Sequence, residues 1–249
     1  MANSFTRTHV IVGVAAALFF SLVLRRRRRR KEIKAPEHNV YPQVVVIFSG
    51  KRKSGKDYLC ERLMLHLQRL YEAQHQDSRC PAVKLGRLSG PLKKAYADEH
   101  NLDFQELLSD GPYKEKYRKD MIAWGEARRK LDPGYFPRLV MAQTRPMPHI
   151  LIISDARRTS DLAFFRDDHR WKCIAVRVEA TDRTRAGRGW KFKEGVDDVE
   201  SERGLDGRCD WDIIVNNDIG DGSDHIGRIA AEVFGGSSGV MEQVAEFRS

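Results

Sequence analysis

The chain has 249 residues and a formal net charge of +9. That length is enough for one α/β domain with a substantial core. The charge is uneven, because residues 1–34 carry nine cations and one anion, which leaves the remaining chain at +1. A body this close to neutral argues against general nucleic-acid binding, which needs a basic face. Local clusters of cations in the body can still bind a small polyanion.

The cysteines give no sign of a metal or disulfide framework. The four of them are widely spaced and include no C-x-x-C pair: Cys60, Cys80, Cys173 and Cys209. This usage favours reduced thiols in a cytosolic domain over a zinc site. We expect a cytoplasmic, monomeric body.

Residues 1–40 form an N-terminal segment that differs in composition from the rest of the chain. Residues 10–24, VIVGVAAALFFSLVL, carry no charge and are followed by a run of arginines. As a helix this segment would be about 22 Å long, shorter than the roughly 30 Å hydrocarbon core of a bilayer. The arginine run on its C-terminal side would keep the body in the cytosol. We favour a membrane anchor, with an organelle-targeting sequence or a disordered tail as the alternatives, followed by a polar linker.

Apolar strand patterns and helical patterns alternate over residues 41–235. Strands are predicted at 44–48, 82–88 (weakly), 150–153, 174–178 and 213–215, with helical spacing between them. Unbroken apolar strands that alternate with helices predict an α/β fold, in which helices cover both faces of a parallel sheet. A Gly- and Ser-rich stretch opens the C-terminal tail, residues 236–249, which we expect to be flexible or helical.

The first motif lies after the first strand, in VVVIFSGKRKSGKDYL, residues 44–59. It matches the phosphate-binding pattern G-x-x-x-x-G-K-[ST] in its strand, loop and helix context. Gly50 and Gly55 let the backbone curl, so that N–H groups and the helix N-terminus face a polyphosphate. Lys56 would reach the β- and γ-phosphates. Three further cations lie in the loop itself: Lys51, Arg52 and Lys53.

Asp57 stands where the pattern has Ser or Thr. A carboxylate is a good Mg²⁺ ligand, directly or through water, and the cations of the loop offset its repulsion of phosphate. The alternative is a helix-capping Asp at a degraded site.

The second motif is HILIISDARRTSD, residues 149–161. Because ligands bind at the carboxyl ends of parallel strands, Asp155 is placed like a second Mg²⁺-binding acid. Arg157 and Arg158 could clamp anionic oxygens. The alternative is a surface loop with ordinary ion pairs.

The third motif combines LSGPLKKAY, residues 88–96, with the predicted helix at 113–130. Lys114 and Arg118 are four residues apart and share a helix face, and Arg129 follows close to three turns later. The alternative is a solvated, charged helix.

The fourth motif is TDRTRAGRGWKF, residues 181–192. Arg183, Arg185 and Arg188, with neighbouring glycines, predict a flexible cationic lid that closes over phosphates. The alternative is a plain basic loop.

Together these motifs resemble the animal-type phosphomevalonate kinases, small P-loop kinases of the nucleoside-monophosphate-kinase type. The resemblance covers roughly residues 44–217 and includes FSGKRKSGKD, RLSGPLK, YKEKYRKDMIAWGE, DPGYF, SDARR, RGW, GVDDVESE and GLD. The loop of that family itself ends in GKD, so Asp57 is a family residue. The resemblance implies a three-layer P-loop kinase fold with a small Arg-rich lid. It also implies transfer of the ATP γ-phosphoryl group to (R)-5-phosphomevalonate with Mg²⁺, a step of isoprenoid and sterol biosynthesis.

The resemblance also implies residue roles. Catalytic roles fall to Lys56, Arg52, Asp155, Arg157 and Arg158. ATP would be bound by Lys51, Arg52, Lys53, Ser54, Gly55, Lys56, Asp57, Arg185, Arg188 and Asp218, the last of which stands where the family carries histidine. Phosphomevalonate would be bound by Lys93, Lys114, Arg118, Arg129, Arg157, Arg158 and Asn217. Asp57 and Asp155 would hold the metal.

The physical argument agrees with a phosphate acceptor. A phosphate monoester has a second pKa near 6, so its oxygens are already nucleophilic at neutral pH and need no general base. Bringing two polyanions together needs cations and positioning, which the arginines and lysines supply. Two alternatives stay open: a P-loop kinase for another phosphorylated acceptor such as a nucleoside monophosphate, and a catalytically silent, membrane-tethered scaffold.

Overall fold

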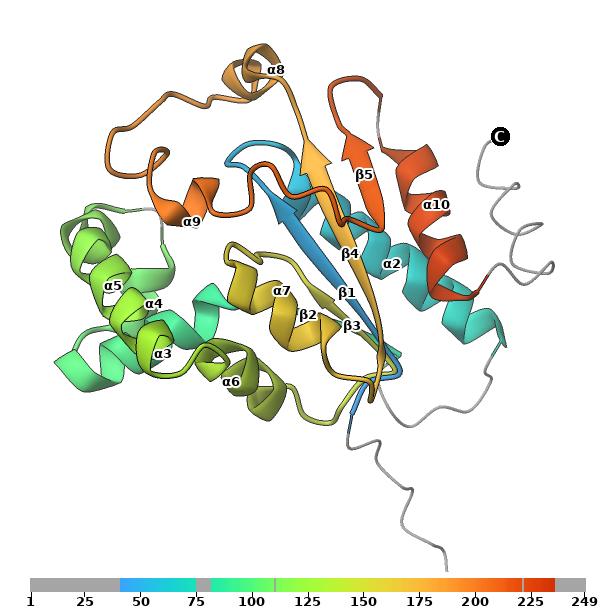
Figure 1. Cartoon of the computed structure of the whole chain (residues 1–249), viewed down its shortest axis with the longest axis horizontal. Helices are drawn as coiled ribbons and strands as arrows, with labels where there is room; N and C mark the ends of the chain where they lie inside the picture. Colours follow the sequence, from blue (N-terminus) through green and yellow to red (C-terminus); the bar gives the residue numbers. More distant parts are fainter. Residues whose placement is uncertain (1–40, 75–81, 110, 221, 236–249) are drawn as a thin grey trace, which may run out of the picture. The chain divides into compact units, whose positions relative to one another are not determined.

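The computed structural model describes residues 41–74, 82–109, 111–220 and 222–235. Residues 1–40, with their predicted anchor, the 236–249 tail and Cys80 lie outside the described residues. Figure 1 shows the arrangement of the elements. In chain order they are β1 (Val44–Gly50), α2 (Lys56–Gln74), β2 (Val83–Gly86), α3 (Ser89–His100), α4 (Phe104–Leu108), α5 (Pro112–Leu131), α6 (Tyr135–Gln143), β3 (Ile150–Ile153), α7 (Thr159–Arg166), β4 (Lys172–Glu179), α8 (Asp182–Gly187), α9 (Glu200–Arg203), β5 (Ile213–Asn216) and α10 (Ser223–Val233).

The five described strands form one parallel sheet in the order β2-β3-β1-β4-β5. Val44 is in register with Ile150 of β3 on one side and with Lys172 of β4 on the other. The central strand β1 is apolar and fully buried through residues 45–48, as a strand covered on both faces must be. All carboxyl ends therefore point to the same edge, where β1 opens into the predicted phosphate-binding loop.

Helices cover both faces of the sheet, which confirms the predicted layered α/β fold (Figure 1). On one face, Leu59, Leu63 and Leu67 of α2 pack with α10 against β1, β4 and β5. On the other face, α6, α7 and Leu205 pack against side chains of β1, β3 and β4. This burial of alternating side chains on the two faces fixes the strand register.

Helices α3, α4 and α5 build a smaller cluster of their own beside the sheet. Tyr96 and Ala97 of α3, Leu107 of α4 and Met121 of α5 are its buried members. The polar N-terminal half of α5 is thereby held next to the loop edge.

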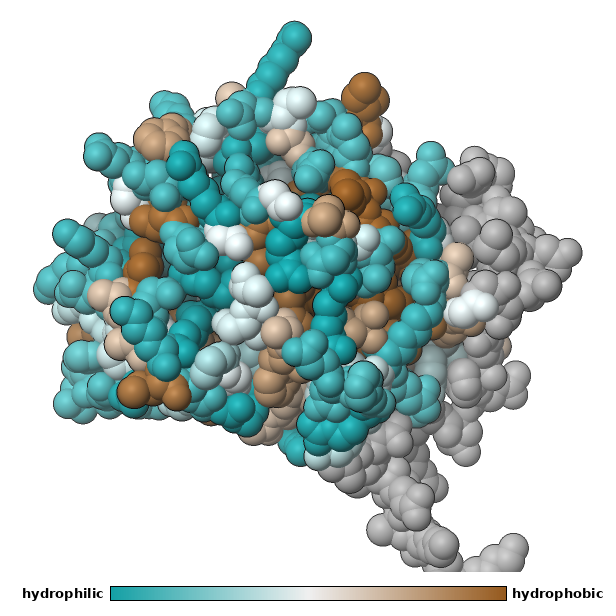
Figure 2. Space-filling view, viewed as in Figure 1, coloured by the Kyte–Doolittle hydropathy of each residue, from teal (hydrophilic) through white to brown (hydrophobic). Residues whose placement is uncertain are grey.

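The described part of the chain contains no helix long and apolar enough to cross a membrane. The face seen in Figure 2 is mostly hydrophilic, with the brown hydrophobic residues in several separate groups. The predicted membrane segment, residues 10–24, lies outside the described residues and stays a prediction.

Candidate active site

The loop between β1 and α2 curls so tightly that two of its positions have no room for a side chain. A Cβ on Gly50 would lie 2.7 Å from both Ser54 Oγ and the Val178 carbonyl oxygen. Gly55 has a φ of +91°, and a Cβ there would lie 2.1 Å from Asn217 Nδ2. Glycine is therefore required at both ends of the loop, as in a P-loop.

Lys56 and Asp57 begin α2 and pair with each other. Lys56 Nζ lies 2.6 Å from Asp57 Oδ1, and the lysine side chain is only 8% exposed. Burial alone would raise the pKa of the Asp57 carboxyl, but the charge and hydrogen bond of Lys56 outweigh it and lower that pKa. Asp57 is thus a carboxylate at neutral pH, with a side chain 66% exposed and open to a ligand.

The arginine-rich stretch after β4 is folded onto the loop. Arg185 Nε donates to the Arg52 carbonyl at 2.9 Å, and its side chain is buried. Arg188 donates to the carbonyls of Ser54, at 2.9 Å, and Asn217, at 2.7 Å. Residues 182–187 form the short helix α8, and Arg185 and Arg188 satisfy carbonyls of the loop. The flexibility expected of this cationic lid stays a prediction.

Asp155 follows β3 and lies at the same edge of the sheet, as predicted. Its two carboxylate oxygens accept hydrogen bonds from the backbone N–H groups of Leu88, at 2.6 Å, and Ser89, at 3.0 Å. Asp155 therefore ties the end of β3 to the start of α3. Sequence reasoning missed this contact, because 66 residues separate Asp155 from Ser89.

A cavity of about 580 Å³ opens beside the loop. Its walls come from the loop, from the start of α3, from one side of α5, from the β3–α7 turn and from residues 196–202. Six of the seven predicted substrate-binding residues line it, together with Asp57 and Asp155: Lys93, Lys114, Arg118, Arg129, Arg157 and Arg158. The third motif is therefore one wall of a cavity and not merely a solvated helix face. We call this space the acceptor cavity.

Two arginines that line the acceptor cavity each have a buried Nε atom without a partner in the described part of the chain. The Nε atoms of Arg129 and Arg158 are buried and have no hydrogen-bond partner among the described residues. Arg129 lies 3.6 Å from the Asp161 carboxylate, and Arg158 pairs with Glu126. Burial raises the pKa of Asp161, whereas the charge of Arg129 opposes that rise. Unpaired buried donors are costly, so these two guanidinium groups have unmet hydrogen-bonding capacity next to a cavity that can take an anion.

Acidic partners of the cationic residues were missing from the sequence-based predictions. Arg118 Nε donates to Glu115 at 2.9 Å, and Lys193 Nζ lies 2.7 Å from the same carboxylate. These hydrogen bonds lower the pKa of Glu115 to about 2. The Glu115 to Arg118 spacing of three residues on a helix was a signal that could have predicted the pair.

Asn217, the seventh predicted substrate residue, lies elsewhere. Its buried side chain donates from Nδ2 to the Ser54 carbonyl at 2.8 Å and packs against Gly55. Next to it, Asp218 accepts hydrogen bonds from the backbone and hydroxyl of Thr181, at 2.7 and 2.9 Å. Both residues therefore fasten the end of β5 to the loop and to α8, on the far side from the acceptor cavity.

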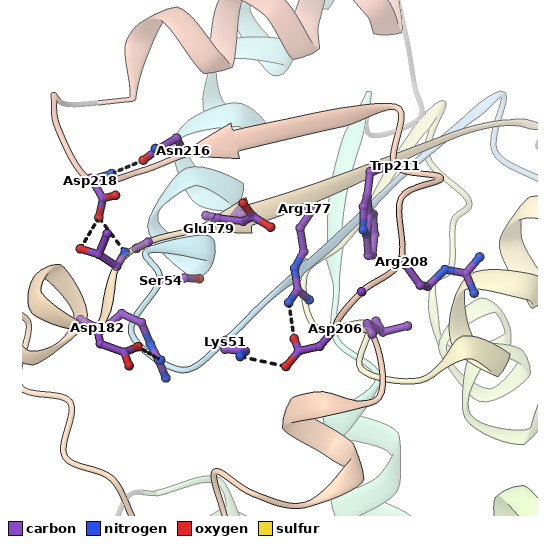
Figure 3. A pocket seen from close by; sticks show the side chains of 16 residues that line it. Lys51, Ser54, Arg177, Glu179, Asp182, Asp206, Arg208, Trp211, Asn216 and Asp218 are labelled. Carbon is purple, nitrogen blue, oxygen red and sulfur yellow. Dashed lines mark hydrogen bonds and ion pairs between the residues drawn. The ribbon is translucent and has the colours of Figure 1, made fainter.

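A second cavity, of about 410 Å³, lies between the loop, β4 and residues 205–211 (Figure 3). Lys51 and Arg177 both point to Asp206 there, each at 2.8 Å, and Trp211 stands beside Arg177. Four residues predicted to bind ATP line this cavity: Lys51, Ser54, Arg185 and Asp218. The loop thus has one cavity on each side.

A parallel sheet in this strand order, with a glycine-bounded phosphate loop after β1 and an arginine-rich helix closed on it, defines a P-loop kinase. The family model described as phosphomevalonate kinase matches residues 48–170. A curated relative, the phosphomevalonate kinase of Drosophila melanogaster, is 42% identical over 178 residues, which cover 70% of this chain and 88% of that protein. The chain belongs to the phosphomevalonate kinase family and is an ATP-dependent kinase.

Proposed function

We propose that the chain transfers the γ-phosphoryl group of ATP to (R)-5-phosphomevalonate, giving (R)-5-diphosphomevalonate and ADP. The observation that supports this most is the acceptor cavity, which is lined by eight basic side chains, six of them outside the loop. Two of its arginines also have a buried Nε atom without a partner among the described residues. A hydroxyl acceptor would instead need a catalytic base near the transferred group.

In this proposal the loop holds the phosphates of ATP. Its backbone N–H groups and the N-terminus of α2 face the polyphosphate, and Lys56 exchanges Asp57 for phosphate oxygens. The buried Ser54 hydroxyl, which has no partner among the described residues, fits a loop that awaits a ligand. Arg188 and Arg185 keep α8 closed over the loop, and the nucleotide extends toward the second cavity and Asp218.

The transfer step needs no proton acceptor. An oxygen of the acceptor phosphate attacks the γ-phosphorus, while the bond to the β–γ bridging oxygen breaks and ADP leaves with that electron pair. Arg52, Arg157 and Arg158 balance the negative charge that gathers between the two substrates. Lys93, Lys114, Arg118 and Arg129 hold the acceptor in line, and apolar side chains such as Leu92 and Met121 contact its hydrocarbon part.

Asp57 and Asp155 fit a Mg²⁺ ion carried by ATP. Among the described residues there is no group of three or more His, Cys, Asp or Glu side chains that could hold a metal by themselves. Two carboxylates that line the same cavity are nonetheless sufficient, because Mg²⁺ keeps waters and takes phosphate oxygens from its substrate. The ion would neutralise charge on the transferred phosphoryl group.

A coupled ADP-release assay of the full chain tests the proposal against its nearest rival. Mg²⁺-ATP is offered with phosphomevalonate or with each common nucleoside monophosphate. We expect turnover with phosphomevalonate alone. Turnover with a nucleoside monophosphate only would assign the cavity to that acceptor, and no turnover with any acceptor would favour the scaffold.

We further propose that residues 1–34 attach the enzyme to a membrane. The apolar run at 10–24 and the following arginines support this. Fractionation of cells that express the full chain or a chain lacking residues 1–34 tests it. Membrane recovery of the full chain alone is expected, and equal solubility of the two chains would contradict the anchor.

A further inference from the structure

Two carboxylates, one between α8 and α9 and one within α9, contact arginines that line the acceptor cavity. Asp197 and Glu202 belong to GVDDVESE, residues 195–202, a motif to which no role has been assigned so far. Their side chains are only 4% and 5% exposed, although the segment itself is largely exposed. Buried carboxylates are costly unless they are paired, so their partners indicate what they do.

Asp197 holds the loop arginine. Arg52 donates to its Oδ2 at 2.9 Å, and Trp190 Nε1 and the Lys193 backbone N–H donate at 3.2 and 2.8 Å. Burial alone would raise the pKa of Asp197, but these hydrogen bonds and the charge of Arg52 outweigh it and lower that pKa. The Arg52 side chain is thereby joined to residues 190–197.

Glu202 holds the second arginine and the loop backbone at once. One carboxylate oxygen pairs with Arg157, and the other accepts from the Arg52 backbone N–H at 3.2 Å. The Glu202 carboxylate therefore accepts from two converging donors, a backbone N–H group of the loop and a guanidinium group. Glu202 thus fixes the distance between the loop and the β3–α7 turn.

We propose that Asp197 and Glu202 are positioning residues for the phosphoryl transfer: they hold Arg52 and Arg157 at the junction of the loop and the acceptor cavity. Two free guanidinium groups at this junction would repel each other and extend into solvent. A buried acidic partner for each removes that freedom before the substrates bind, so less reorganisation remains for the transfer step. The effects expected on the reaction rate rest on the proposed function, whereas the effects expected on ATP binding do not.

Double-mutant cycles test the proposal in the full chain. Glu202→Gln and Arg157→Gln are each expected to lower kcat/KM for phosphomevalonate by about 10- to 100-fold, the cost of a misplaced positioning group. The double variant should be no worse than Arg157→Gln alone, because Glu202→Gln keeps a carbonyl oxygen for the Arg52 backbone N–H and removes only the charge that holds Arg157. Losses that multiply, or a Glu202→Gln enzyme with wild-type rate, would overturn the proposal.

The control and a second readout separate this proposal from a general effect on folding. Glu194→Gln removes an exposed carboxylate from the same segment and should leave the rate unchanged. If Glu202→Gln melts in the assay range, Glu202→Asp keeps the charge but shortens its reach, and should show the same loss and the same non-additivity with Arg157→Gln. Wild-type rate in Glu202→Asp would contradict the role.

ATP titration without an acceptor keeps the test independent of the proposed substrate. Asp197→Asn should weaken ATP binding, measured by calorimetry, and should add nothing in an Arg52→Gln background. If the wild-type chain binds ATP but does not phosphorylate phosphomevalonate, the proposed function fails while this cycle still decides the positioning role. Unchanged ATP affinity in Asp197→Asn would refute the role of that residue.

Discussion

The phosphate loop and the acceptor cavity solve the same problem, anion binding, by different means. The loop uses eight consecutive residues, 50–57, and works through backbone N–H groups that two glycines place. The acceptor cavity draws its cations from α3, α5, the loop and the β3–α7 turn, and works through long side chains. Many of those side chains lie against an acidic partner from another part of the chain.

This difference has a physical consequence for mutations. Backbone donors cannot be removed by a side-chain change, so the loop depends on its glycines and on Lys56. Eight basic residues line the acceptor cavity, and six of them lie outside the loop. A change at one of those six should weaken acceptor binding and leave ATP binding nearly intact.

The largest effect is expected from Lys56→Met in the loop. It removes the cation assigned to the transferred phosphoryl group, so kcat/KM should fall by several orders of magnitude. Stopped and coupled assays measure the rate, and circular dichroism checks that the fold is kept. Near-normal activity would remove Lys56 from its assigned role and erase the contrast between the two regions.

A smaller, more selective effect is expected from Arg129→Gln in the acceptor cavity. Loss of a charged hydrogen bond costs about 1.5–3 kcal/mol, so KM for phosphomevalonate should rise about 10- to 100-fold. The KM for ATP should change little. Arg228→Gln on α10, an exposed arginine on the opposite face of the sheet, is the matched control. An equal rise in both KM values would contradict the division into two sites.

The two candidate metal-binding carboxylates, Asp155 and Asp57, should differ in their contribution to the free energy of unfolding. Asp155→Ala leaves two backbone N–H groups of α3 unpaired and should lower the free energy of unfolding by about 1–3 kcal/mol. Asp57→Ala removes an exposed side chain and should not. Chemical denaturation measures both, and equal losses would show that Asp155 has no structural role beyond that of Asp57.

Asp57→Asn should raise the Mg²⁺ concentration needed for half-maximal rate. Burial would raise the pKa of Asp57, but Lys56 outweighs burial and keeps that pKa below its ordinary value of 3.8. The Asp57 carboxylate is therefore ionised at every pH above 3.8 and is protonated only at lower pH. The Mg²⁺ requirement of the wild-type enzyme should therefore not change with Asp57 ionisation between pH 6 and pH 8. A shift of this requirement across that range, absent in Asp57→Asn, would contradict the low pKa.

The smallest effect is expected outside both regions. A chain lacking residues 1–34 should show the same kcat and KM values as the full chain, because the kinase body begins after them. A clear loss of turnover would give the N-terminal segment a part in the site.

The sequence predicted what depends on local pattern. The strands of the sheet, the glycines of the loop and the shared α5 face of Lys114, Arg118 and Arg129 all follow from spacing along a few turns or residues. The contacts of Asp155 with the start of α3 and of Glu202 with Arg157 could not be predicted in this way. They join residues 45 to 67 positions apart, which only the fold brings together.

The arginines of α8 illustrate the same limit. Read locally, this stretch rich in Arg and Gly predicts a flexible cationic lid, with a plain basic loop as the alternative. Arg185 and Arg188 instead satisfy carbonyls of the phosphate loop more than 130 positions away, and this long-range pairing holds the helix closed.

The most direct test of the central claim follows the γ-phosphate itself. The full chain is incubated with ATP labelled on its γ-phosphate, Mg²⁺ and phosphomevalonate, and the products are separated. The account predicts that the label appears in diphosphomevalonate, one for each ADP formed, and that little is released as inorganic phosphate. Label that appears only as inorganic phosphate, or only when a nucleoside monophosphate is added, would contradict it.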